Sequence, residues 1–215
     1  MNRILHFKNI CLIPPTGFVL YFVLFLIAAS QYSGGYVADV DFVGFSWLHN
    51  YWCDLSSTLA INGQINEGRP YAIVAMIIAC LCLALFYYLF SIHFHLSKFW
   101  KRGIPAFGLP SSLCAILIFT PFHNSMLLLA LAFGLLPVIG ITRHIFKGDL
   151  LPFKKSGRLL LLLIAANIFI YYTRIGLIAL PLLQKITFLI ALGYVGILCL
   201  KMRKDWSDSL KENSK

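Results

Sequence analysis

Long apolar runs alternate with short polar connectors along most of the chain. Each run is close to the roughly 20 residues that an α-helix needs to cross ~30 Å of hydrocarbon. We therefore predict an all-α integral membrane bundle of six transmembrane helices, in which residues 1–215 form a single domain. The expected spans cover residues 10–29, 71–92, 104–121, 122–142, 159–180 and 182–202.

The connector after the first run, residues 31–70, is much longer than the others and has a different pattern. Its apolar residues recur at spacings of three and four, which is the period of a helix with one apolar face. The stripe comprises Phe45, Leu48, Trp52, Leu55 and Leu59. We expect a short amphipathic helix here, which either lies along the membrane surface or folds over the bundle as a lid.

Basic and acidic residues occupy different connectors. The first connector carries Asp39, Asp41, Asp54 and Glu67 against Arg69 alone, whereas Lys and Arg concentrate at the termini and in the second and fourth connectors. Because Lys and Arg mark the cytoplasmic side of membrane proteins, both termini should be cytoplasmic and the long connector extracytoplasmic. This topology suits a plasma membrane or a bacterial inner membrane.

The composition supports a membrane environment. The chain is 60% hydrophobic and 12% charged, with a mean hydropathy of +0.82, whereas soluble domains carry about 25% charged residues. The net charge of +10 is best explained by contact of the cytoplasmic face with anionic headgroups, since no nucleic-acid-binding motif accompanies it. Membrane lipids are the expected partners, and the sequence carries no sign of an oligomeric state.

The predicted topology gathers polar residues at the extracytoplasmic face. Arg174 and Lys185 fall in apolar surroundings, where a charge is costly without a partner. Asp54 and Glu67 are candidate partners, and the alternative is that both cations reach the headgroups. Helices that begin at this face also direct free N–H groups toward it. The sequence thus predicts an anion- or lipid-headgroup-binding pocket formed by Asn50, Asp54, Glu67, Arg69, His123, Asn124, Arg174 and Lys185.

Three alternatives to simple binding remain open. Asp54 and His123 have side chains suited to acid–base catalysis, so they would be the catalytic pair of an intramembrane lipid-modifying hydrolase or transferase. A metal held by His49, Asp54 and His123 is a further alternative, without a compact ligand motif such as HExxH; no other cofactor is predicted. A small transporter is the third, although few charges lie within the spans.

Two segments carry a resemblance to known membrane proteins. The stretch NYWCDLSS…NEGRPYA and the later FTPFHNSMLLLALAFG resemble the domain-of-unknown-function family 998 of six-helix membrane proteins. The match covers about residues 51–134 in order and transfers Asn50, Asp54, Leu55 and His123; Cys53 and Ser56 depart from the family's Ser and Gly. The chain is also distantly similar to the DRAM-like group. The resemblance implies six helices with an outward Asp and His, and a link to lipid or membrane trafficking, but no reaction.

Overall fold

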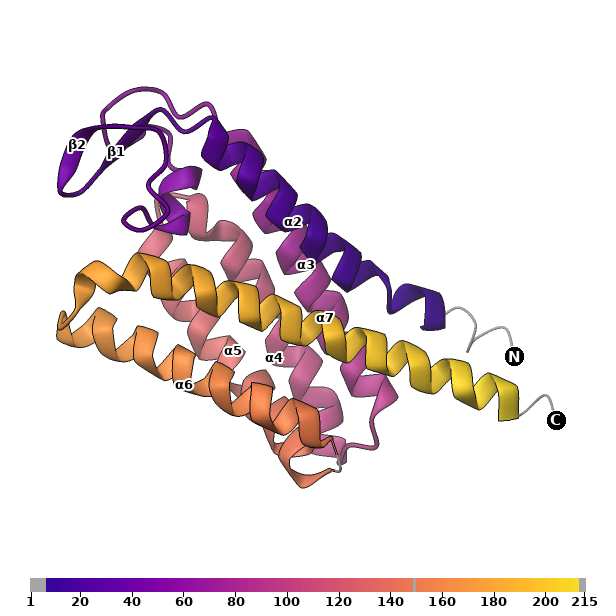
Figure 1. The fold of residues 1–215 in the computed structure, drawn as a ribbon. Helices are drawn as coiled ribbons and strands as arrows, with labels where there is room; N and C mark the ends of the chain where they lie inside the picture. Colours follow the sequence, from indigo (N-terminus) through magenta and orange to yellow (C-terminus); the bar gives the residue numbers. More distant parts are fainter. Residues whose placement is uncertain (1–6, 149, 213–215) are drawn as a thin grey trace.

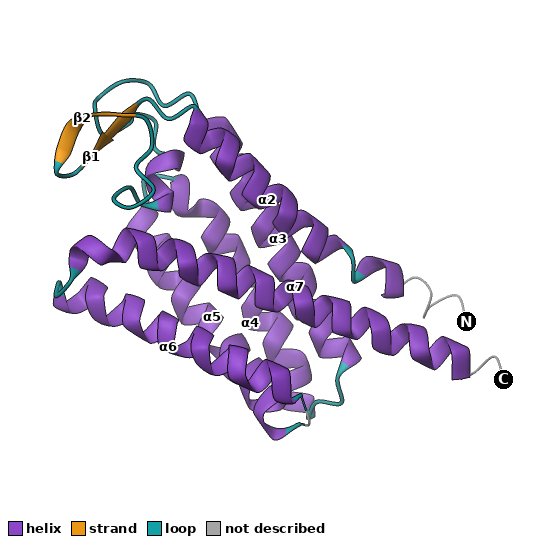
Figure 2. Ribbon diagram, viewed as in Figure 1, coloured by secondary structure: helices purple, strands orange, loops and turns teal. Residues whose placement is uncertain are grey.

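The computed structural model describes residues 7–148 and 150–212, and this part of the chain is mainly helical (Figures 1 and 2). Six of its helical segments are long and apolar enough to cross a membrane, as the hydropathy pattern predicts. The main helices are α2 (Ile13–Ser30), α3 (Arg69–His93), α4 (Lys98–Ile116), α5 (His123–Lys147), α6 (Leu151–Thr173) and α7 (Leu180–Glu212).

Successive helices run in alternating directions and pack mainly on their sequence neighbours. Helix α3 packs against α2 and α4, and α5 packs against α4. Helices α6 and α7 form a hairpin that contacts the rest of the bundle mainly through α7 and α2 (Figure 1). We call the end that carries residues 31–68 the loop end. The opposite end, where α2 begins and α7 ends, is the terminal end.

The helix limits differ from the predicted spans at several ends, and two of these differences have a clear local cause. Helix α4 begins at Lys98 rather than at residue 104, because its basic first turn continues the helix beyond the apolar run. Helix α6 ends at Thr173 instead of residue 180, since Arg174 (φ 63°) and Gly176 (φ 74°) adopt left-handed conformations that stop it. The short 3-10 helix η3 (Leu177–Ala179) then leads into α7.

The long connector contains a β-hairpin that the sequence pattern did not predict. Strands β1 (Gly34–Tyr36) and β2 (Asp39–Val43) pair antiparallel (Figure 2). Gly35 has φ +85°, and a Cβ there would lie 2.6 Å from the backbone nitrogen of Asn62. Only glycine fits this conformation and this close approach.

The amphipathic helix expected over the apolar stripe is reduced to one 3-10 turn, η1 (Trp52–Ser56). Ser57 is already extended, with ψ 148°. The hydroxyl of Ser56 donates to the Cys53 carbonyl, as Ser and Thr side chains do when they compete with regular helix. The turn therefore ends where Ser56, Ser57 and Thr58 follow one another.

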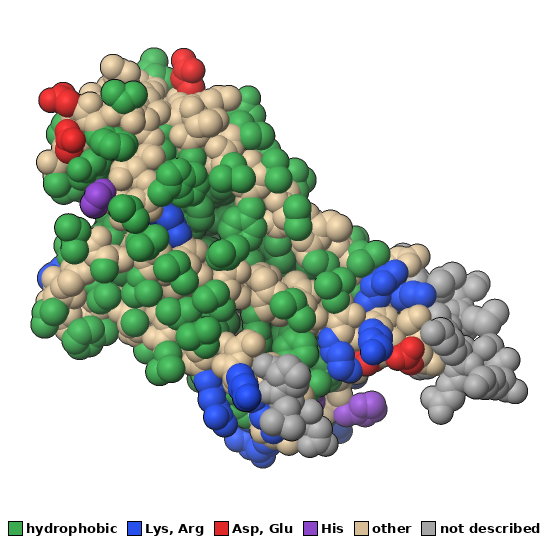
Figure 3. Space-filling model, in the orientation of Figure 1, with side chains coloured by type: hydrophobic (Ala, Val, Ile, Leu, Met, Phe, Trp, Pro, Cys, Tyr) green, Lys and Arg blue, Asp and Glu red, His purple; other side chains and the backbone are tan. Residues whose placement is uncertain are grey.

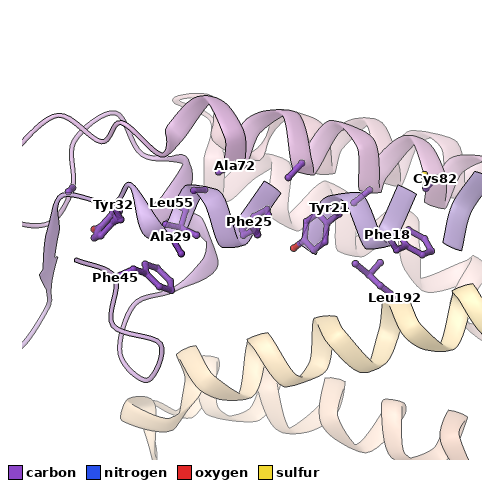
Figure 4. Close-up of a cluster of buried hydrophobic side chains, with 14 residues drawn as sticks. Phe18, Tyr21, Phe25, Ala29, Tyr32, Phe45, Leu55, Ala72, Cys82 and Leu192 are labelled. Carbon is purple, nitrogen blue, oxygen red and sulfur yellow. The ribbon is translucent and has the colours of Figure 1, made fainter. Parts of the chain in front are cut away.

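The connector packs onto the helices rather than standing free. Phe45 and Leu55 continue a core cluster formed by Tyr21 and Phe25 of α2 and by Leu192 of α7 (Figure 4). A second cluster lies at the terminal end, where α3, α4, α5 and α7 meet. Phe45, Trp52 and Leu55 of the apolar stripe thus face the bundle, whereas Leu48 and Leu59 are exposed, and residues 31–68 form a folded cap over the loop end.

Close backbone packing fixes the start of α3. Gly68 precedes the helix, and a Cβ at this position would lie 2.2 Å from the carbonyl oxygen of Ala28 in α2. Its backbone angles (φ −72°, ψ −18°) are open to any residue, so the need for glycine here is one of space.

Surface charges gather mainly at the two ends. Figure 3 shows Lys and Arg concentrated near the terminal end, acidic side chains on the cap, and a largely hydrophobic surface between them. Within the hydrophobic part, Asn167 of α6 donates to Thr187 of α7 at 2.7 Å, which ties the last two helices together.

Candidate binding cavity at the loop end

The side chain of Asn50 organises the cap. Asn50 is fully buried, and its Oδ1 accepts from the Ser46 amide at 2.8 Å. Its Nδ2 donates to the Gly35 carbonyl at 2.9 Å and to Asp54 Oδ2 at 3.1 Å. Because both amide hydrogens and the carbonyl oxygen are used, Asn50 joins the hairpin to η1 and has little capacity left for a ligand.

Asp54 closes the first turn of η1. Its Oδ2 accepts from the Tyr51 amide at 2.7 Å in addition to Asn50. Burial raises the pKa of this carboxyl, while the bonds from Asn50 and Tyr51 and the charge of Lys185 act in the opposite direction. Asp54 therefore stabilises the start of η1 through its side chain.

Lys185 of α7 reaches into the cap and is only 8% exposed. Its Nζ donates to the Asn50 carbonyl, and to the Pro181 carbonyl at 3.2 Å. The same nitrogen lies 5.4 Å from the ring centre of Phe45 and 5.8 Å from that of Trp52, within cation–π range. We call these contacts the Lys185 latch.

The partners of the buried Lys185 ammonium group are not the carboxylates that the sequence suggested. Among the described residues, the ion pairs within 4.0 Å involve Asp205, and none joins Lys185 to Asp54 or Glu67. Two backbone carbonyls and two aromatic rings contact the ammonium group instead of a carboxylate. Lys185 therefore holds the cap on α7 rather than presenting its charge to solvent.

A cavity of about 540 Å³ lies between the cap, the start of α3 and the turn before α5. We call it the loop-end cavity. It contains two of the predicted site residues, Arg69 and His123, together with hydroxyl, thiol and apolar groups. The residues that line it are Cys53, Ser56, Ser57, Thr58, Arg69, Ile118, Phe119, Thr120, Pro121 and His123.

His123 is oriented by the turn that precedes α5. Its Nδ1 lies 2.7 Å from the Ile118 carbonyl oxygen and donates to it, because a carbonyl can only accept. Thr120 stabilises the same turn by donating from its hydroxyl to the Leu117 carbonyl at 2.7 Å. Nε2 is therefore the ring nitrogen left for contact with a ligand.

Arg69 is positioned by the end of the cap. Its Nε donates to the Ser56 carbonyl at 3.1 Å. The preceding turn is held by Asn66, whose Nδ2 lies 3.2, 2.9 and 3.0 Å from the carbonyl oxygens of Asp54, Leu55 and Ser57. Asn66 Oδ1 accepts from the Gly68 amide at 3.1 Å. Sequence reasoning did not single out Asn66; its place just before a helix start was the available signal.

The other predicted site residues lie outside the lining of this cavity. Glu67 and Asn124 are exposed, and Arg174 is exposed with its guanidinium 5.2 Å from the ring centre of Tyr171. His49 stacks on Tyr36 at 4.5 Å. Within residues 7–148 and 150–212, no three His, Cys, Asp or Glu side chains gather as metal ligands, so His49, Asp54 and His123 do not form such a group.

The six long apolar helices are those of a multi-pass helical membrane protein, and the cavity lies beside the folded cap at one end of the bundle. No family model, curated protein or solved structure matches this chain.

Proposed function

We propose that this membrane protein binds an amphiphile with an anionic, phosphate-bearing headgroup in the loop-end cavity. The observation that carries the proposal is that Arg69 and His123, which are far apart in sequence, line one cavity. Its volume of about 540 Å³ falls in the usual range for small-molecule sites.

The lining matches a charged headgroup with an apolar tail. A guanidinium offers a planar fork of donors that suits phosphate oxygens, and Arg69 uses Nε on the protein, which leaves its terminal nitrogens for a ligand. Thr58 adds a hydroxyl donor, whereas the hydroxyls of Ser56, Ser57 and Thr120 already donate to backbone carbonyls. Phe119 and Pro121 line the same cavity, and the neighbouring Phe122 is exposed, so a tail would leave along an apolar edge.

His123 adds a ring nitrogen of fixed orientation to this site. Its Nδ1 is occupied by the bond to Ile118, so Nε2 is the nitrogen that a ligand would contact. Asp54 is not among the lining residues and its Oδ2 serves the cap, so the proposal is for binding rather than for an Asp54–His123 reaction.

Replacement of Arg69 tests the proposed ligand. In Arg69→Gln, the loss of a charge-assisted hydrogen bond is expected to reduce retained anionic lipid about tenfold, measured by native mass spectrometry after gentle detergent extraction. Arg174→Gln is the matched control, because it removes the same charge from an exposed arginine outside the cavity. Equal retention in the two variants would contradict the assignment of Arg69.

We also propose that the cap is extracytoplasmic and that both termini are cytoplasmic, in a plasma membrane or bacterial inner membrane. The acidic cap and the basic terminal end support this orientation. In a Cys53→Ser background, which removes the exposed native thiol of the cap, a membrane-impermeant maleimide added to whole cells should label Gln64→Cys on the exposed cap turn. It should label Lys155→Cys only after permeabilisation. The reverse pattern would overturn the orientation.

A further inference from the structure

A second cavity lies at the terminal end, where α3 passes into α4. It measures about 380 Å³ and is lined by Ile92, His93, Phe94, His95, Leu96, Ser97 and Lys101. We call it the terminal-end cavity. Three of these side chains carry nitrogen groups that are cationic or become cationic on protonation, and no lining residue is acidic. One wall is apolar, through Ile92, Phe94 and Leu96.

His93 forms a fixed part of this lining because α7 holds both of its ring nitrogens. The indole N–H of Trp206 donates to Nδ1, so the proton of the neutral ring is on Nε2. That nitrogen lies 3.3 Å from Asp205 Oδ2 and donates to it. Lys201 donates to the other oxygen of Asp205 at 2.5 Å. The negative charge nearest to His93 is thus already paired with a lysine.

Lys101 supplies the permanent positive charge of the cavity. It lies one turn into α4, and its amide donates to the Ser97 carbonyl at 2.9 Å. Ser97 is the N-cap residue, but its side chain forms no capping hydrogen bond. The helix start therefore reinforces the positive potential that Lys101 creates in the cavity.

We propose that the terminal-end cavity binds a phosphate group, with Lys101 as its main ionic contact and a ring N–H of His95 as a second donor. The charge, the hydroxyl of Ser97 and the apolar wall suit the phosphate of a membrane lipid headgroup, and a free phosphate ion shares the same chemistry. This site is separate from the loop-end cavity, and neither proposal depends on the other.

A pair of lysine variants tests the proposal. Full-length protein in nanodiscs of phosphatidylcholine with a minor fraction of phosphatidylglycerol would be analysed by native mass spectrometry for bound phosphatidylglycerol. We expect Lys101→Gln to lower its occupancy about tenfold, as loss of a charge-assisted hydrogen bond implies. Lys98→Gln removes the same charge from the same helical turn, outside the cavity lining, and should have little effect.

Two further arms test the role of charge and identify the source of the phosphate. Lys101→Arg keeps the charge and should retain binding, which would show that the site requires a positive charge at this position. Inorganic phosphate titrated into detergent-solubilised protein distinguishes the sources: binding that depends on Lys101 would assign a free ion, and lipid binding alone would assign a headgroup. Equal losses in Lys101→Gln and Lys98→Gln, or no loss in either, would overturn the proposal.

Discussion

Gly68→Ala is expected to destabilise the protein strongly, by about 1–3 kcal/mol. The added Cβ would lie 2.2 Å from the Ala28 carbonyl oxygen and 2.9 Å from its carbonyl carbon, so α2 and α3 must separate to admit it. Backbone atoms cannot rotate away as a flexible side chain can. Because Gly68 immediately precedes Arg69, the displacement also reaches the loop-end cavity.

Gly193→Ala is the matched control for this effect. Gly193 lies within α7, and a Cβ there would meet nothing within 4 Å. Since alanine is the better helix former, this variant should be as stable as the parent or slightly more stable. The midpoints of thermal unfolding of the two variants would be compared in detergent, with the loss of monodisperse protein as the readout. Equal midpoints for Gly68→Ala and Gly193→Ala would show that α2 and α3 are not in close backbone contact.

Lys185→Met is expected to release the cap from α7 and to destabilise it by about 2–4 kcal/mol. The substitution leaves the buried Asn50 carbonyl without its lysine donor and removes the cation from the rings of Phe45 and Trp52. The chain length and apolar character of the side chain are nearly preserved. We therefore expect faster proteolysis within residues 31–68 and faster maleimide labelling of the exposed Cys53.

Lys204→Met provides the control, because Lys204 is an exposed lysine of the same helix. It should leave proteolysis and labelling unchanged. Methionine relieves the desolvation cost of a buried lysine but offers no donor to the Asn50 carbonyl. A Lys185→Met protein with a cap as resistant as that of Lys204→Met would show that the Lys185 latch does not hold the cap.

The helices were predictable because a segment that spans a bilayer must pair its own backbone N–H and C=O groups, which an α-helix does. Long apolar runs in the sequence therefore mark the spanning helices directly. The charge asymmetry between ends was equally visible in the connectors. The β-hairpin was not, since β1 has three residues and all of β2 is exposed, which leaves no alternation between buried and exposed positions. A longer helix was predicted in place of the 3-10 turn, because the apolar spacing that suggests a helix also arises in an irregular cap. In this cap Phe45, Trp52 and Leu55 pack on the bundle.

The candidate site was predictable only in part. The need for a partner at Lys185 followed from its apolar surroundings, but backbone carbonyls and ring faces have no sequence signature. The shared cavity of Arg69 and His123 depends on how the turn before α5 packs beside the start of α3. Such long-range placement follows from helix packing, which the one-dimensional pattern does not encode.

Helix α7 spans 33 residues, which corresponds to about 50 Å and exceeds the ~30 Å of hydrocarbon. It carries Lys185 near its first turn and Trp206 near its last, and these side chains hold the cap and His93, respectively. A continuous helix transmits axial displacement along its whole length. An axial shift of α7 by a fraction of a turn would therefore disturb the contacts of Lys185 and of Trp206 together. The cap and the terminal end are thus connected through a single helix.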